Sequence, residues 1–196
     1  NRLGWLDSSS EVVKNAASYI DLKKVLLAEG FTDLLLVGMG GAVLTPEVLA
    51  CTQAGNGLRL HVLDTTNPDE INDVINLLNL ETTIFIISSK SGGTLETRML
   101  CSYFWERIAD PRRFIAITDE GTELEKFAQS HQFRHIELGI SSVGGRFSAI
   151  SPFGMLPAAL CGFDPVQFAL RADEMLSACK QINIAKNPGA FLGVIL

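Results

Sequence analysis

Hydroxyl-bearing side chains and glycines gather in one short stretch of this 196-residue chain. Ser89, Ser91 and Thr94 offer hydroxyl donors there. Gly92 and Gly93 let the backbone approach a ligand closely. The following residues have a helical pattern, and the first N–H groups of that helix would point into the loop. The stretch therefore predicts a site for an anionic group such as phosphate. The alternative is an ordinary solvated connection, in which Ser, Thr and Gly are common.

Two cationic side chains are further candidates for binding an anion. Lys90 lies inside the hydroxyl-rich stretch, but a lysine beside a loop is more often solvated, and we do not assign it as a ligand. Arg146 follows the pair Gly144-Gly145 and precedes the apolar segment 150–160. An arginine in that position is costly to bury without an anion. A backbone carbonyl or a carboxylate of the protein would satisfy it equally well, so spacing alone leaves both roles open.

A second glycine-rich turn, Gly38-Met39-Gly40-Gly41, also lies between an expected strand and an expected helix. With Asp64 at the end of the next strand, it partly matches the fingerprint of dinucleotide-binding proteins. Val43 replaces the third glycine of that fingerprint, which removes the close contact between helix and strand. We therefore interpret the turn as a sugar-phosphate turn or a purely structural one rather than a dinucleotide site.

Other reactive side chains show no useful spacing. His61 lies on an expected strand, and His131 and His135 straddle a boundary between helix and strand, so we predict no metal site. The four cysteines lie far apart and form no C-x-x-C pair. This pattern is typical of reduced thiols in a cytoplasmic protein.

Alternating strands and helices would position these loops. Short apolar runs predict strands at residues 33–37, 59–63, 83–87, 114–118 and 133–138. Helices are expected at 7–30, from 45 onward, and at 70–79, 95–108, 123–130, 150–160 and 165–180, with Thr45 as an N-cap and Pro46 as the first helical residue. The order predicts an α/β fold, a three-layer, doubly wound, five-stranded parallel sheet of the flavodoxin-like type, in a single domain spanning 1–196. Ligands of such sheets bind outside the carboxyl ends of the strands.

Composition excludes several classes of protein. A hydrophobic content of 47%, with 19% charged residues, predicts a folded core rather than disorder. The net charge of −6 argues against nucleic acid and membrane surfaces as partners, because both are polyanions. The longest apolar runs are shorter than the roughly 20 residues of a membrane span. The chain starts at Asn1 and stops inside the apolar segment 191–196, so we expect part of a longer protein.

Three loops together resemble the glucose-6-phosphate isomerase family: residues 38–41, 88–97 and 143–152. The third is close to the family signature and is the most specific, whereas the second alone would indicate only a sugar-isomerase (SIS) domain. Residues 3–6 and 62–66 are most similar to the isomerase half of bifunctional transaldolase/glucose-6-phosphate isomerases. The resemblance covers nearly the whole chain, but only the first SIS subdomain of the family.

The resemblance implies a reaction and a role for each matching residue. The reaction is the reversible conversion of glucose 6-phosphate to fructose 6-phosphate through a cis-enediol, without cofactor or metal, in a cytoplasmic homodimer. Ser89, Ser91 and Thr94 would hold the phosphate of the hexose 6-phosphate. Gly41 would line the sugar site, and Arg146 would be the catalytic cation that stabilises the enediol charge.

The chain departs from the family pattern in two ways. Ala42 replaces the serine that follows the paired glycines, which puts substrate affinity or choice in doubt. The family's catalytic glutamate and ring-opening histidine lie downstream, beyond Leu196, and Glu96 is a poor substitute for that base. These 196 residues are therefore expected to bind sugar phosphate weakly and not to turn it over. The alternative is a non-catalytic SIS module that senses a sugar phosphate.

Overall fold

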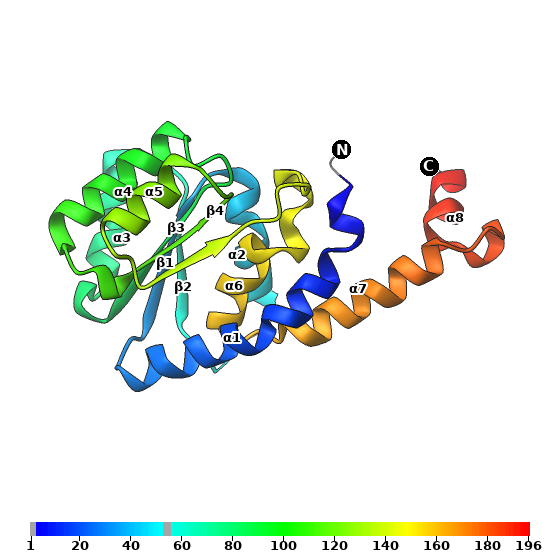
Figure 1. Cartoon of the computed structure of the whole chain (residues 1–196), viewed down its shortest axis with the longest axis horizontal. Helices are drawn as coiled ribbons and strands as arrows, with labels where there is room; N and C mark the ends of the chain where they lie inside the picture. The colour runs from blue at the N-terminus through cyan, green and yellow to red at the C-terminus, as the bar shows by residue number, and fades with distance from the viewer. Residues whose placement is uncertain (1–2, 53–55) are drawn as a thin grey trace.

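The computed structural model of the protein describes residues 3–52 and 56–196. Its centre is a parallel sheet of five strands in the order β2-β1-β3-β4-β5 (Figure 1). The strands are β1 (Asp33–Gly38), β2 (Arg59–Leu63), β3 (Thr83–Ser88), β4 (Phe114–Thr118) and β5 (His135–Leu138). This confirms the predicted doubly wound, flavodoxin-like α/β fold.

Helices cover both faces of the sheet and make three layers (Figure 1). One face carries α1 (Ser8–Ala28), α2 (Leu44–Thr52), α6 (Pro152–Leu160) and α7 (Pro165–Cys179). The other face carries α3 (Pro68–Leu77), α4 (Leu95–Ile108) and α5 (Glu123–Ser130). The last helix, α8 (Pro188–Ile195), lies at the outer end of α7, beyond the body of the sheet (Figure 1).

The central strands are buried on both faces because their side chains are apolar without interruption. In β3, Ile84 and Ile86 pack in the core under α1 and α6, whereas Phe85 and Ile87 pack under α4 and α5. All four are fully buried, and burying each is worth about 1.5 to 3 kcal/mol. The apolar pattern that predicted these strands is therefore also what stabilises the sheet.

Strand order creates a crevice between β1 and β3. The chain leaves β1 toward β2 on one side and reaches β3 on the other side. The helices that follow β1 and β3 therefore diverge onto opposite faces, and ligands of such sheets bind at this point. Gly38 at the end of β1 pairs with Ser88 at the end of β3, so the glycine-rich turn and the hydroxyl-rich loop begin side by side.

Most predicted boundaries lie within two residues of the observed ones, and the differences have local causes. Helix α2 begins at Leu44, so Thr45 lies within its first turn and the prediction of Thr45 as N-cap was wrong. Pro46 is not the first helical residue, as predicted, but it still lies in the first turn, where a missing N–H leaves no bond unmade. Strand β5 begins at His135 rather than at residue 133, because Phe133 turns into the aromatic core instead of joining the ladder.

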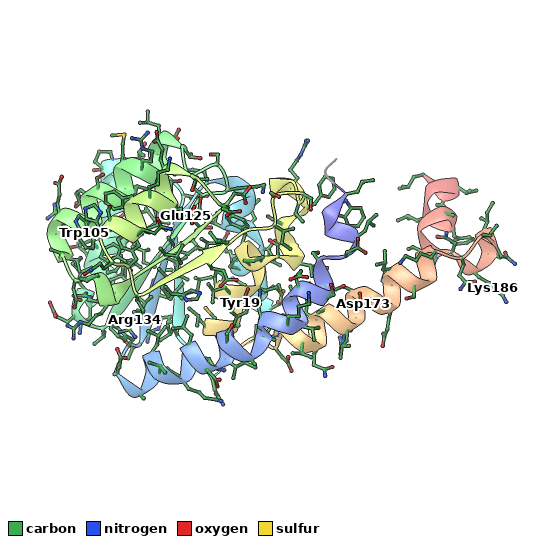
Figure 2. All side chains as sticks on the ribbon, viewed as in Figure 1. Tyr19, Trp105, Glu125, Arg134, Asp173 and Lys186 are labelled. Carbon is green, nitrogen blue, oxygen red and sulfur yellow. The ribbon has the colours of Figure 1, made fainter. Side chains whose placement is uncertain are left out.

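Helix α1 packs lengthwise on the neighbouring layer. Ser9 near its start donates a hydrogen bond to Asp173 of α7, which Figure 2 shows beside the first turns of α1. Tyr19 is buried further along α1 and donates to Glu137 of β5 at 2.7 Å.

Among the helices described, none is long and apolar enough to cross a membrane.

Candidate active site

A pocket of about 410 Å³ lies at the carboxyl ends of β1, β3 and β4, where the strand order predicted one. Gly41, Ser89, Ser91 and Thr94 all contribute to its wall. The fifth predicted residue, Arg146, follows Gly145, which also lines the pocket. The structure therefore brings together the loops of all five predicted site residues, although they span more than half of the sequence.

The hydroxyl-rich loop is held by its own hydrogen bonds. The Ser89 hydroxyl is buried and donates to the Thr94 hydroxyl at 3.2 Å. The backbone N–H of Gly92 donates to the Ser89 carbonyl at 3.1 Å, and that of Gly93 to the Ser91 hydroxyl at 3.3 Å. A loop fixed in this way loses little further entropy when it orders around a ligand.

Helix α4 points its amino end at this loop. Thr94 is its N-cap residue, but the Thr94 side chain makes no capping hydrogen bond. Backbone N–H groups of the first turn have no partner within a helix, and the helix dipole places partial positive charge there. With the loop hydroxyls beside it, this helix end has the donors and the charge that an anion requires.

Gly92 fixes the loop against the start of α5. Its φ of +63° lies in the left-handed region, which side chains disfavour. A Cβ atom at this position would lie 2.5 Å from the Cβ of Thr122, the N-cap residue of α5. Both observations explain why glycine stands there.

Gly41 brings the glycine-rich turn into contact with the arginine loop. A Cβ atom on Gly41 would lie 2.5 Å from the carbonyl oxygen of Gly145, so the two backbones touch. Ser148 bridges the same loops, because its hydroxyl group is 2.6 Å from the Gly145 oxygen and 3.3 Å from the Gly41 oxygen. The contact positions the backbone of the arginine loop at the edge of the pocket.

Arg146 itself is exposed, and its guanidinium makes no hydrogen bond or ion pair with any residue in the described ranges. The spacing left two kinds of partner open for Arg146, an anionic ligand or a carbonyl or carboxylate of the protein. The second kind is not observed among the described residues. Because Arg146 is exposed, the cost of burying its charge, which suggested an anion as partner, does not arise either. Arg146 is not part of the pocket wall, but it follows Gly145, which is, and its guanidinium could bind an anion without first breaking an ion pair with a described residue.

The N-terminal segment supports the arginine loop, which sequence reasoning missed. Trp5 stacks on Phe147, with ring centroids 5.6 Å apart. The backbone N–H of Gly4 donates to the Ser142 carbonyl at 3.2 Å, and Leu3 forms an isolated bridge with Val143. A tryptophan so near the start of the chain was the signal in the sequence that could have indicated this contact.

Lys90 is not solvated as expected. Its ammonium group pairs with the Asp119 carboxylate and also donates to the Ile140 carbonyl at 3.3 Å. Lys90 and Asp119 both line the pocket. Asp119 directly follows β4 as Ser89 directly follows β3, and that equivalent position was a signal that could have indicated a partner.

The pocket is rich in hydroxyls and poor in groups that could act as a base or bind a metal. Ala42 contributes to its wall, so a methyl group stands in the region where the family pattern has serine. Of the residues that line the pocket in the described ranges, Asp119 is the carboxylate, and none is His or Glu. The described residues contain no cluster of His, Cys, Asp or Glu side chains arranged for a metal ion.

The fold and the pocket together define the class of α/β domain that solved sugar-phosphate isomerases contain, the SIS type. The family model described as phosphoglucose isomerase matches residues 23–193. This chain belongs to the phosphoglucose isomerase family.

Similar proteins agree with this assignment. The glucose-6-phosphate isomerase of Gloeothece citriformis is 35% identical over 176 residues, which cover 85% of this chain and 33% of that protein. A solved hypothetical protein from Thermus thermophilus superposes with a TM-score of 0.90 at 26% identity, and the match covers 100% of this chain and 48% of the Thermus chain. The solved glucose-6-phosphate isomerase of Chlamydia trachomatis superposes with a TM-score of 0.78 at 25% identity, and the match covers 92% of this chain and 37% of that one. The chain spans about a third of the length of the curated relatives it matches.

Proposed function

We propose that this chain is the sugar-phosphate-binding part of an isomerase that interconverts glucose 6-phosphate and fructose 6-phosphate. One observation carries the proposal: the loops after β1, β3 and β5 converge on one pocket rich in hydroxyls. The names of the similar enzymes supply the substrate.

In this proposal each loop has one task. Ser89, Ser91 and Thr94 bind the phosphate, helped by the amino end of α4. Gly41 lines the sugar site and, having no side chain, lets the backbone of Gly145 pack against it. Ala42 presents a methyl group to the sugar. Arg146 lies over the carbons that react.

The proposed reaction moves one proton between neighbouring carbons. A base removes the proton from C2 of the open-chain aldose, and the carbonyl oxygen at C1 gains the electrons and then a proton, which gives a cis-enediol. Returning a proton to C1, with loss of the one on the C2 oxygen, gives the ketose. A cation fixed beside the developing oxyanion lowers this barrier, and losing one such group typically costs about 10² to 10³ in rate.

The base is proposed to come from outside these 196 residues. Asp119 is the carboxylate of the pocket wall, and Lys90 already engages it. A base must lie within hydrogen-bond reach of the proton it removes, and Glu96 is exposed on α4 and is not part of the pocket wall. The chain alone is thus expected to bind but not to convert substrate, and the full-length protein is proposed to act as a homodimer.

The test compares the full-length protein with this chain. The full-length protein should interconvert the two hexose phosphates, and fructose 6-phosphate in D₂O should yield glucose 6-phosphate labelled at C2, whereas the chain alone should do neither. Ser91→Ala should raise KM about tenfold or more through a lost charge-assisted hydrogen bond, and Ser18→Ala, an exposed hydroxyl on α1, should not. Binding without turnover by the full-length protein would instead support a sugar-phosphate sensor.

A further inference from the structure

A second cavity, of about 220 Å³, lies between α4 and α5 behind the hydroxyl-rich loop. Ile87 at the end of β3, Leu124 of α5 and Phe127 of α5 give it apolar walls. It is separate from the candidate active site, although Ser89 contributes to both. The function proposed above makes no use of it.

One polar group in this cavity lacks a partner. Thr97, on α4, lines the cavity and is 1% exposed, yet its hydroxyl makes no hydrogen bond with any residue of the described ranges. Thr97 lies in the first turn of α4, so the residue four positions earlier, Gly93, lies outside the helix, and the usual bond of a helical threonine to that carbonyl is not made. A buried donor left unpaired is costly, so an acceptor placed in the cavity would be favoured.

The surroundings favour a neutral occupant. Burial raises the pKa of the Cys101 thiol, on the same wall, to about 12, so the thiol presents no charge. The two charged groups that contribute to the cavity, Arg98 of α4 and Glu123 of α5, form an ion pair with each other at 3.0 Å. A charged ligand would lose its hydration without gaining a free counter-ion.

We propose that this cavity binds a small neutral molecule with one ring and one oxygen atom that accepts the hydrogen bond from Thr97. The size agrees, because an apolar cavity of about 150 Å³ is known to hold benzene. The remaining volume accommodates one small substituent. The ring packs against Leu124 and Phe127, and the oxygen faces α4.

An occupant would also contact the hydroxyl-rich loop. Ser89 and Gly92 belong to that loop and line the cavity, so their backbone amides report directly on binding. This readout needs no substrate and no turnover. The proposal therefore stands or falls independently of the proposed isomerase function.

The experiment titrates the isotope-labelled chain with phenol and with toluene, which have nearly the same shape but differ in the oxygen atom. Amide signals of Ser89, Gly92 and Thr97 should shift with both, and phenol should bind about fivefold more tightly, the ratio expected for one net hydrogen bond. Thr97→Val preserves the shape and should remove the preference for phenol while toluene still binds.

Cys101→Leu adds volume to the wall and should weaken both ligands, whereas Cys51→Leu, at an exposed site, should change neither. The melting temperature of each variant checks that it folds. Equal affinity of the parent chain for phenol and toluene, shifts outside the cavity, or no shift with either compound would overturn the proposal. The comparison of two ligands on the unmodified chain decides the matter even where a variant fails to fold.

Discussion

The two edges of the sheet use charged side chains differently. At the amino edge, where the strands begin, three pairs of titratable side chains engage one another, although the buried Arg113 keeps two guanidinium nitrogens without a partner among the described residues. Asp33 bonds the His61 ring at 2.9 Å, Arg112 pairs with Asp110 at 2.8 Å, and Arg134 pairs with Glu29 at 2.5 Å.

The carboxyl edge has the opposite character. Its pocket is built from hydroxyls, glycine backbones and the amino end of α4, and Arg146 lies beside it without a partner among the described residues. Lys90 is the exception, because Asp119 neutralises it. The difference fits the function proposed above, in which polar groups at the carboxyl edge bind a ligand and charge at the amino edge serves stability.

The pKa values at the amino edge agree with this assignment. Arg134 holds the pKa of Glu29 below its ordinary value, and Arg112 does the same for Asp110. Burial alone would raise the pKa of Asp33, but hydrogen bonds from Thr32 and His61 outweigh it and lower the pKa. Folding therefore stabilises the charged form of each of these carboxylates.

The largest expected effect separates function from stability at the carboxyl edge. Arg146→Ala in the full-length protein should lower kcat about 100-fold or more, because a cation that stabilises developing charge is lost. Its free energy of unfolding should stay within about 0.5 kcal/mol of the parent, since the side chain is exposed and unpaired among the described residues. Steady-state kinetics and urea unfolding measure the two quantities, with Arg107→Ala at the far end of α4 as control. A fully active Arg146→Ala protein would rule out the catalytic role proposed for Arg146.

Gly92 tests a place where the carboxyl edge should carry stability. Gly92→Ala forces a side chain into a left-handed backbone and against Thr122, so we expect a loss of about 3 kcal/mol. Its neighbour provides the matched control, because a Cβ on Gly93 would meet nothing closer than 3.9 Å. Urea unfolding of both variants makes the comparison, and equal losses would contradict the packing argument.

Asp33 is the amino-edge counterpart of Arg146. Asp33→Ala removes hydrogen bonds to Thr32 and His61, and we expect a loss of about 2 kcal/mol of stability with kcat and KM unchanged. Thermal unfolding and the isomerase assay on the same full-length preparation report both. A fall in kcat without a fall in stability would show that the two edges are not separate in function.

Acid should weaken the amino edge by a smaller amount. The pKa of Glu29 is lowered by folding, so its contribution is present above the ordinary value of 4.5 and is lost as the pH falls through the lower, folded-state value. Because the Glu29 side chain is 42% exposed, we expect only about 0.5 kcal/mol. Melting curves from pH 6 to pH 3 should show a shallower acid loss for Glu29→Gln than for the parent, and no such change for Glu174→Gln.

Sequence alone placed most of the fold and the walls of the site for local reasons. Strands β1, β3 and β4 are buried on both faces, so each stands out as an apolar run. Helix α4 was predicted with both ends correct because the hydroxyl-rich loop ends at Thr94 just before it and Pro111, shortly after its last residue, cannot continue a helix. The hydroxyls after β3 could be assigned to the carboxyl edge because loop and strand are continuous.

The missed features join residues from different loops. Lys90 meets Asp119, and Gly41 touches Gly145, only after the strands align. The support of Trp5 for the arginine loop depends on the path of the N-terminal segment over the sheet. Patterns of a single segment contain no information about such contacts, which the order of the strands determines.

The stacking of Trp5 on Phe147 has an experimental consequence. The chain has two tryptophans, and the other, Trp105, lies among aromatic rings in the α4 layer (Figure 2) and is not part of the pocket wall. Trp105→Phe would leave Trp5 as the single indole fluorophore, in contact with the residue that follows Arg146. Its emission would then report, in real time, whether the arginine loop moves when a ligand arrives.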